Sequence, residues 1–399
     1  GNVAVDKAYA EQVRSQSVTQ MSSEKEVVNL TSFSKKSKRT ENFNEDWKFY
    51  LGDASNTESL SFDDSQWKGV NLPHDYSIHQ EFSTSMEAES GYLPGGIGWY
   101  RKHFSLTQDM KDKEFRLDFD GVYMDATVWV NGMLLGSHPY GYTPFSFNLT
   151  KHLKFDGTDN VVTVKVNHQT PSSRWYSGSG IYRDVKLQIM NKVHVDLNGV
   201  KIETPELATN KDDVKVNIKV KLVNALTENK NVKIKAKIFK KGNEAEVIGN
   251  AELENKALNT KAVSDVLLNL TAKSPKLWDT ENPNLYTVRV EVLEGDKVLD
   301  TYDSDYGFRW FTADKDKGTF LNGKPIKLKG VCMHHDQGAL GAAAYKRATE
   351  RQVEILKDMG CNSIRVTHNP ASQVLIDICN EKGILLIEEM FDGWMHPKN

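Results

Sequence analysis

Cysteine is scarce in this sequence of 399 residues. The three cysteines, Cys332, Cys361 and Cys379, all lie in the last fifth of the chain. This distribution excludes a disulfide framework, and no Cys or His spacing resembles a zinc site. Long apolar runs are also missing, since none approaches the ~18 residues that a membrane-spanning helix needs. The mean hydropathy of -0.54 agrees with a soluble protein.

An excess of charge of either sign is missing as well. The 51 Lys and Arg residues nearly balance the 54 Asp and Glu residues, which leaves a formal net charge of -3. This balance argues against nucleic acid or an anionic membrane as the main partner and favours neutral partners. The 8 Trp and 14 Tyr residues offer flat faces that suit sugar stacking, although most should lie in sheet cores.

The amino terminus carries no readable targeting signal. Gly1-Asn2-Val3 has neither an initiator Met nor the apolar core of a signal peptide, which suggests a processed or recombinant start. Residues 1–40 are rich in Ser, Lys, Glu and Gln and lack sustained apolar periodicity. We therefore expect them to form a polar N-terminal arm that is loosely attached.

Two blocks of alternating polar and apolar residues follow the arm. Residues 41–191 hold short aromatic-rich strands separated by turn signals such as Asn131-Gly132, and this pattern predicts a jelly-roll β-sandwich. Residues 192–308 contain clean period-2 strands such as 214–220 and 232–238, with lysines on alternate positions. One solvated and one buried face per strand predict an immunoglobulin-like β-sandwich, which we interpret as a spacer.

The last block, residues 309–399, alternates between strand-like and helix-like patterns. After a hairpin at 320–325, strands are expected at 326–332, 362–368 and 383–389, separated by helices at about 345–359 and 371–382. Polar groups at the carboxyl ends of consecutive parallel strands are how a (β/α)8 barrel presents its active site. Only three of eight strands are present, so we expect the chain to end inside a catalytic domain.

Six short segments stand out along the chain. They are Asn71-Leu72-Pro73-His74-Asp75, Trp175-Tyr176-Ser177-Gly178-Ser179-Gly180-Ile181-Tyr182-Arg183, Tyr306-Gly307-Phe308-Arg309, Gly330-Val331-Cys332-Met333-His334-His335-Asp336, Ile364-Arg365-Val366-Thr367-His368-Asn369-Pro370 and Glu388-Glu389. With this domain order, they make the chain from about residue 40 onward similar to glycoside hydrolase family 2. Two of the motifs most resemble the family's β-galactosidases, and the polar arm resembles that of the large cell-surface β-galactosidases of streptococci.

The resemblance implies a retaining exo-β-galactosidase that releases terminal β-linked galactose from oligosaccharides or glycans. In the family the acid/base and nucleophile glutamates belong to barrel strands four and seven, so both are expected beyond Asn399. This segment should then recognise the sugar and be inactive alone, with the rest of the barrel as its partner. An extracellular or cell-surface location follows from the streptococcal likeness, with the cytoplasm as the alternative.

Histidines end the first two predicted barrel strands. A neutral imidazole can donate to one sugar hydroxyl and accept from another. By resemblance His334 and His368 bind galactose, Asn369 is a further contact, and His335 and Asp336 support them. The alternatives are a structural histidine or a metal site, although adjacent ligands of this kind rarely converge on one ion.

Two candidate sugar contacts lie in the predicted jelly roll. By resemblance Asp75 accepts hydrogen bonds from distal sugar hydroxyls, and Arg174 sits on a tight loop before Trp175. The alternative for both is a surface ion pair. Arg174 stands where the best-known bacterial pattern has an aspartate, which places a sodium site on this loop in doubt. Removing the Asp75 carboxylate is expected to weaken galactose binding and to leave stability nearly unchanged.

The remaining acids and the strand arginine are interpreted as support. Glu388 and Glu389 are neighbours on a strand and point apart, whereas a retaining glycosidase needs two carboxyls ~5 to 5.5 Å from each other. Asp392 is grouped with them. Arg365 is expected to be buried in the barrel floor beside a carboxylate.

Two other functions remain open. A β-glucuronidase of the same family would need a cation for the sugar carboxylate, and Arg174 is the candidate. A carbohydrate-binding or adhesion protein would perform no chemistry. No cofactor is required from this segment, while a divalent or sodium ion in the intact enzyme is left open.

Overall fold

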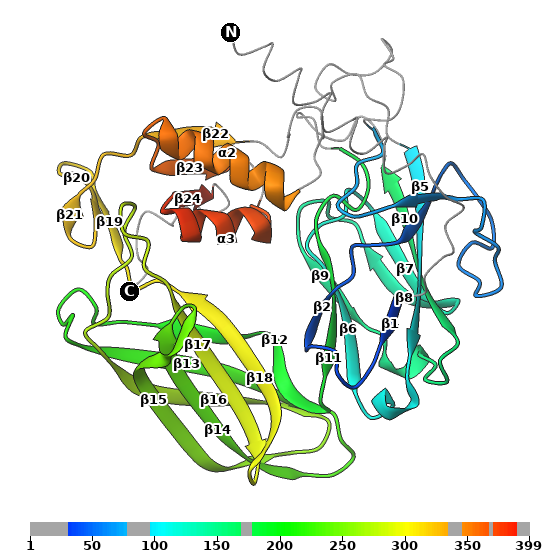
Figure 1. Ribbon diagram of the computed structural model, residues 1–399, viewed down its shortest axis with the longest axis horizontal. Coiled ribbons are helices and arrows are strands. Elements are labelled where there is room, and N and C mark those ends of the chain that lie inside the picture. Colours follow the sequence, from blue (N-terminus) through cyan, green and yellow to red (C-terminus); the bar gives the residue numbers. More distant parts are fainter. Residues whose placement is uncertain (1–30, 78–95, 169–177, 334–344, 367–369, 389–399) are drawn as a thin grey trace.

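The computed structural model describes residues 31–77, 96–168, 178–333, 345–366 and 370–388. Figure 1 shows two β-sandwiches, one blue to cyan and one green to yellow, and a smaller α/β segment in orange and red. This arrangement confirms the predicted fold class of a jelly roll, an immunoglobulin-like sandwich and the start of a barrel.

The first sandwich packs a seven-stranded sheet on a four-stranded one. The first sheet has the order β4-β3-β5-β10-β7-β8 with β1 paired to β5, and the second has the order β2-β11-β6-β9. The bounds are β1 (Thr31–Phe33), β2 (Thr40–Asn42), β3 (Trp47–Leu51), β4 (Lys68–Val70), β5 (Gly96–Leu106), β6 (Glu114–Phe119), β7 (Ala126–Val130), β8 (Met133–His138), β9 (Phe145–Asn148), β10 (Asp159–His168) and β11 (Val185–Met190). The predicted Asn131-Gly132 hairpin is confirmed, because it joins β7 to β8.

The prediction of a loosely attached polar arm is wrong for residues 31–40. Thr31–Phe33 form β1, which pairs with β5, and the Phe33 side chain is buried in the core. Arg39 donates from Nε to Asp300 Oδ1 of the second sandwich at 2.8 Å and from Nη2 to the Val195 carbonyl at 2.8 Å. A three-residue strand is too short to show periodicity, so the sequence pattern missed it.

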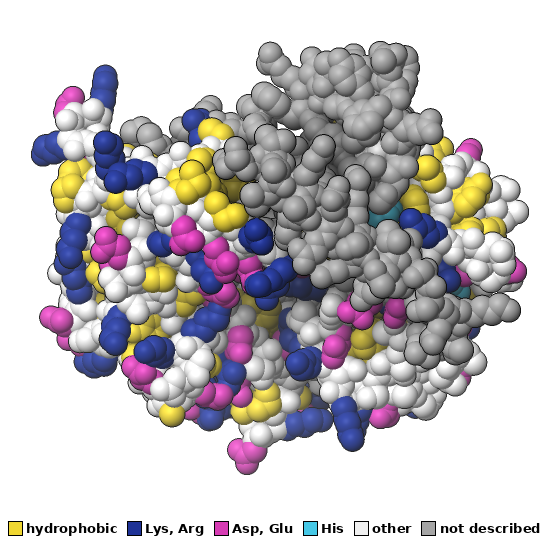
Figure 2. Space-filling view, turned by 45° about the horizontal axis from the view of Figure 1, so that its top comes forward, with side chains coloured by type: hydrophobic (Ala, Val, Ile, Leu, Met, Phe, Trp, Pro, Cys, Tyr) yellow, Lys and Arg dark blue, Asp and Glu magenta, His cyan; other side chains and the backbone are white. Residues whose placement is uncertain are grey.

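The second sandwich has the alternation that the sequence predicts. Its sheets have the orders β12-β13-β16 and β15-β14-β17-β18. Along β13 the apolar side chains from Val214 to Leu222 are buried and the lysines between them are exposed. The strands are β12 (Val193–Glu203), β13 (Asp213–Asn224), β14 (Lys230–Lys240), β15 (Asn243–Leu258), β16 (Ala262–Lys273), β17 (Tyr286–Glu294) and β18 (Lys297–Tyr306). Figure 2 shows one side of the molecule, on which Lys, Arg, Asp and Glu side chains are interspersed wherever the surface is not drawn in grey.

The third unit begins with a small antiparallel sheet and continues as a parallel one. Its elements are β19 (Phe311–Asp314), β20 (Gly318–Leu321), β21 (Lys324–Pro325), β22 (Gly330–Met333), α2 (Lys346–Asp358), β23 (Ser363–Val366), α3 (Gln373–Lys382) and β24 (Leu385–Glu388). The β20–β21 hairpin and the strand-helix alternation are as predicted. Ile364 and Val366 pack with Val353 of α2 and with Leu375 and Ile378 of α3, so both helices cover one face of the parallel sheet.

Helix α3 is held at its carboxyl end by the second sandwich. The Trp278 indole donates to the Asn380 carbonyl at 2.8 Å, and the Arg309 guanidinium donates to Asn380 Oδ1 at 3.0 Å. The helix ends at Gly383, whose φ of +79° is the left-handed conformation that favours glycine. A β-carbon there would lie 2.4 Å from the Thr280 carbonyl oxygen, so the contact also requires the absence of a side chain.

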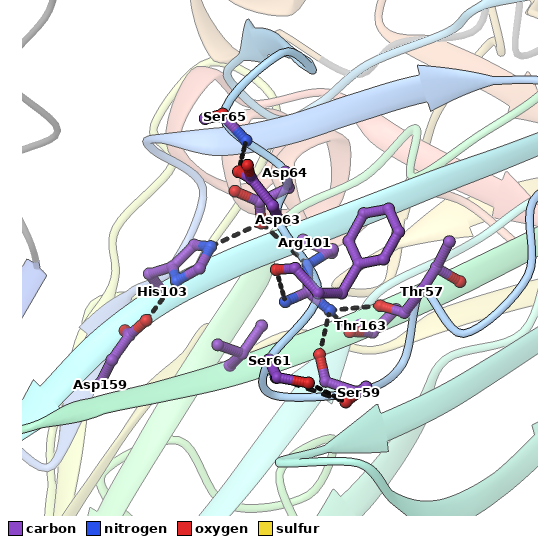
Figure 3. Close-up of polar contacts among 12 residues, drawn as sticks. Thr57, Ser59, Ser61, Asp63, Asp64, Ser65, Arg101, His103, Asp159 and Thr163 are labelled. Carbon is purple, nitrogen blue, oxygen red and sulfur yellow. Dashed lines mark hydrogen bonds and ion pairs between the residues drawn. The ribbon is translucent and has the colours of Figure 1, made fainter.

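A charged cluster holds the loop between β3 and β4 against the outer face of the first sandwich (Figure 3). Arg101, fully buried on β5, donates from Nε to Asp64 Oδ2 at 2.8 Å and from Nη1 to Thr163 Oγ1 at 3.1 Å. His103 on the same strand lies between Asp64 and Asp159 and bonds to both. The loop is therefore fixed by charge-assisted hydrogen bonds as well as by apolar contacts.

Deprotonation of His103 is predicted to weaken this cluster. Burial alone would lower the pKa of His103, but its hydrogen bonds to Asp159 and Asp64 outweigh burial and raise the pKa to about 9. The unfolded imidazole has a pKa of about 6.5, so this stabilisation is fully present below about pH 6.5 and is lost as the pH rises through 9. We expect a loss on the order of 2 kcal/mol in the free energy of unfolding.

Thermal denaturation of the wild type and His103→Gln at pH 6 and pH 9.5 measures this effect. The wild type should lose several degrees more than the variant between these pH values. His152→Gln is the control, because it removes another imidazole of the same sandwich that lies outside the cluster. Equal losses in the wild type and His103→Gln would show that His103 does not carry the pH dependence.

Candidate functional site

The carboxyl ends of the three parallel strands lie side by side. Met333 of β22 pairs with Val366 of β23, and Val366 pairs with Glu388 of β24. The residues predicted to bind the sugar from the barrel, and those predicted to support them, lie at or just after these positions. Most of them lie outside the described residues, namely His334, His335, Asp336, His368, Asn369, Glu389 and Asp392. The structure therefore defines the strand ends that precede the predicted site.

Helices α2 and α3 cover one face of the parallel sheet but not the other. Ile364 and Val366 face the helices, whereas Cys332 and Arg365, which pair in register, have exposed side chains. The expectation that Arg365 is buried is therefore wrong for this chain. The face away from α2 and α3 has no covering layer among the described residues, which explains the exposure of the guanidinium.

Asp75 is buried, with 1% of its surface exposed, on the loop after β4. Its Oδ1 atom accepts hydrogen bonds from the Ser77 amide at 3.0 Å, the Ser77 hydroxyl at 2.7 Å and the Ser179 amide at 2.9 Å. Backbone bonds join the same two segments, from the His74 amide to the Ile181 carbonyl at 2.7 Å. One oxygen of this carboxylate thus links two loops that are far apart in the sequence.

The surroundings of Asp75 are polar but enclosed. The buried His168 ring bonds to the Ser179 hydroxyl, and His74 Nδ1 lies 2.6 Å from the Tyr100 hydroxyl. Burial lowers the pKa of His168 to about 4, although Asp75 acts in the opposite direction. The imidazole is therefore neutral near pH 7 and contributes hydrogen bonds without adding a charge.

Glycine is required where these segments meet. Gly180 has a φ of +122°, and a β-carbon there would lie 2.4 Å from the Tyr100 hydroxyl oxygen. The Gly180 amide and carbonyl exchange hydrogen bonds with Tyr123. The backbone at Gly180 thus lies against the core of the sandwich, which fixes the neighbouring Ser179 amide beside Asp75.

The sandwich that carries Asp75 contacts the barrel segment at two points. Arg183 of the same sandwich donates from Nη2 to the Pro370 carbonyl at 2.7 Å. Asp120 Oδ2 accepts a hydrogen bond from the Gln373 amide at 3.0 Å.

Sequence reasoning found Asp75 and missed its neighbours. Ser179 and Arg183 belong to a motif from which only the adjacent Arg174 was selected, and Arg174 lies outside the described residues. His168 carried no motif signal, because its role depends on the fold. No group of three His, Cys, Asp or Glu side chains within the described ranges is arranged to hold a metal ion. None of the helices described here is long and apolar enough to cross a membrane.

The burial of Asp75 changes the expected effect of its removal. Asp75→Ala should lower the free energy of unfolding by about 2 to 4 kcal/mol, because three donors lose their charged acceptor. This loss replaces the expectation from the sequence that removing the Asp75 carboxylate leaves the stability of the protein nearly unchanged. Asp75→Asn should cost less, since an amide oxygen can still accept these bonds. Urea denaturation measures both, with Ser77→Ala as a control that should cost about 1 kcal/mol. Unchanged stability in Asp75→Ala would contradict the structural role.

Comparisons with known proteins cover most of the chain. Residues 41–191 match the model described as "Glycosyl hydrolases family 2, sugar binding domain". Residues 193–309 match "Glycosyl hydrolases family 2", and residues 313–393 match "Glycosyl hydrolases family 2, TIM barrel domain".

Individual relatives extend over the same region. A beta-galactosidase of Bacteroides ovatus is 41% identical over 363 residues, which span 89% of this chain and 42% of that protein. The crystal structure of a family 2 member from Bacteroides cellulosilyticus has 39% identity and a TM-score of 0.84, and covers 89% of this chain and 46% of that one. A beta-glucuronidase of Bacteroides uniformis has 31% identity and a TM-score of 0.78, with 87% and 41% covered. The chain thus spans less than half the length of these relatives.

Proposed function

The chain belongs to glycosyl hydrolases family 2, and on this basis we propose that the intact protein is a retaining exo-β-galactosidase. Its substrates would be oligosaccharides or glycans with terminal β-linked galactose. The observation that carries the proposal is that residues 179–183 of the first sandwich contact both the buried Asp75 carboxylate and the Pro370 carbonyl of the barrel segment. A sandwich loop at that position would close one side of a barrel pocket, as a terminal sugar requires.

The proposed roles follow the predicted residues. Sugar binding is assigned to Asp75, Arg174, His334, His368 and Asn369, and support to His335, Asp336, Arg365, Glu388, Glu389 and Asp392. A carboxylate is a strong acceptor for two vicinal hydroxyls, and a neutral imidazole can both donate and accept. Together these groups would recognise the pattern of hydroxyls on a galactose ring.

The chemical step would use two glutamates beyond residue 399. One would protonate the leaving oxygen while the other attacks the anomeric carbon, and water would then open the glycosyl-enzyme. The residues assigned to sugar binding would hold the ring in the orientation that this attack needs. A divalent or sodium ion in the intact enzyme is also proposed, but no described residue is assigned to it.

The proposed location is extracellular or on a bacterial cell surface, with the cytoplasm as the alternative. It rests on the likeness of the polar arm to the streptococcal enzymes, which stays a prediction. A tagged full-length protein in fractionated cells would distinguish the two locations.

A beta-glucuronidase is the second candidate, because solved relatives with that name share this fold at 31% identity. It would require a cation opposite the sugar carboxylate, for which Arg174 is the candidate. Turnover of aryl β-galactoside and aryl β-glucuronide by the intact protein distinguishes the two. Sugar binding without turnover of either substrate would instead favour a carbohydrate-binding or adhesion protein.

Asp75→Asn in the intact enzyme is predicted to lower kcat/KM for an aryl β-galactoside by at least about a hundredfold. The reason is the loss of a charge-assisted hydrogen bond to the sugar, which is worth ~2 to 3 kcal/mol. Ser77→Ala is the matched control, because it removes one donor to Oδ1 and keeps the carboxylate. It should lower stability with near-normal kinetics. Normal kinetics in Asp75→Asn would remove this residue from the site.

A polypeptide of these 399 residues alone is predicted not to hydrolyse an aryl β-galactoside. The resemblance to the family implies that both catalytic glutamates belong to later strands, and the groups assigned here would only position the sugar. The uncovered face around Cys332 and Arg365 should also make this polypeptide prone to association. Turnover that persists through rigorous purification, above a mock-purified control, would refute this expectation.

A further inference from the structure

One short segment of the first sandwich touches both Asp75 and the barrel. At one end of Ser179–Arg183, the Ser179 amide donates to Asp75 Oδ1 at 2.9 Å. At the other end, Arg183 donates to the Pro370 carbonyl, just before α3, at 2.7 Å. Five residues therefore connect the proposed sugar-binding carboxylate to the second strand-helix unit of the barrel.

This segment has little freedom to move. The Ile181 carbonyl accepts from the His74 amide, and the Ser179 carbonyl accepts from the Tyr76 amide at 2.8 Å. The Tyr182 hydroxyl donates to the Gly141 carbonyl at 2.7 Å. Arg183 is 1% exposed, and its guanidinium carbon lies 5.1 Å from the centroid of the Tyr182 ring. A displacement at Pro370 would therefore be passed along the segment instead of being absorbed within it.

The contact with the barrel has a second anchor. Asp120 Oδ2 accepts from the Gln373 amide, the first residue of α3, at 3.0 Å. That amide is one of those without an intrahelical partner, and a carboxylate at a helix amino terminus is electrostatically favourable. Gly121 follows Asp120, and a β-carbon there would lie 3.0 Å from Arg183 Cδ and 2.9 Å from the Tyr182 hydroxyl oxygen. Asp120 and Arg183 thus lie close together in the first sandwich, and both form hydrogen bonds to the backbone at the start of α3.

We propose that Arg183, assisted by Asp120, is a positioning residue that sets where the Asp75 carboxylate lies relative to the barrel strand ends. It does not touch the sugar. This inference rests on the proposed function of Asp75, and it adds that recognition depends on a domain-to-domain hydrogen bond. Loss of that bond should loosen the Ser179–Arg183 segment and the 74–77 segment bonded to it, and should misplace Asp75 against the rest of the sugar pocket.

The test compares Arg183→Met and Arg183→Lys with Arg39→Met in the full-length enzyme. Arg39 also joins two domains, through Asp300 and the Val195 carbonyl, but it has no part in the Asp75 segment. Steady-state kinetics on an aryl β-galactoside and a thermal melt are measured for each variant. Arg183→Met should raise KM at least tenfold, Arg183→Lys should restore part of it, and Arg39→Met should lose stability with KM and kcat within twofold of the wild type.

Hydrogen exchange provides a readout that does not depend on the substrate. Arg183→Met should increase amide exchange both in peptides covering 370–375 and in peptides covering 74–77, and Arg39→Met should do so in neither. KM and kcat within twofold of the wild type in Arg183→Met would overturn the inference. If the wild type hydrolyses neither galactoside nor glucuronide, the proposed function fails. The hydrogen-exchange result alone then tests whether Arg183 links the barrel to the Asp75 segment. A rise in both regions would then support the link, and a rise confined to 370–375 would overturn it.

Discussion

Helix α3 contacts both sandwiches, one through each of its ends. The amino end meets the Asp120 carboxylate of the first sandwich, and the carboxyl end meets the Trp278 indole and the Arg309 guanidinium of the second. The Asp120 carboxylate suits the partial positive charge of the amino end, and the Trp278 indole N–H donates to a carbonyl near the carboxyl end. A ten-residue helix is thus fixed along its axis by two domains, and the parallel strands packed on it are fixed with it.

This placement gives the candidate site its composite character. Parallel strands can supply side chains from their carboxyl ends, but a carboxylate such as Asp75 reaches that region only if the sandwich is held against the barrel. Asp75 in turn is held by Ser77 and by Ser179, which lies 104 residues away in the sequence. The proposed sugar contact and the folded structure therefore share one side chain.

Local sequence patterns predicted most strands and helices, but they could not predict contacts between residues that are far apart in the sequence. Period-2 alternation identified β13 and β14, Asn131-Gly132 identified a hairpin, and strand-helix alternation identified the barrel start. Strand β1 was missed because three residues cannot show a period. The exposure of Arg365 depends on which layer covers its sheet, and the burial of Asp75 depends on Ser179. The partner of Arg183 lies 187 residues further on, so no pattern around Arg183 could have revealed it.

The close approach of Gly383 to Thr280 bears on how freely such domains can be recombined. The order of sandwich, sandwich and barrel suggests modules that could be exchanged among relatives. Here the backbone that leaves α3 runs against the Thr280 carbonyl of the second sandwich with no room for a side chain, and Lys357 of α2 donates to both the Thr280 and the Gly383 carbonyls. A chimaera that joins this barrel segment to a different spacer must therefore also take the loop around Thr280. The second sandwich and the barrel have to be exchanged together and not as single domains.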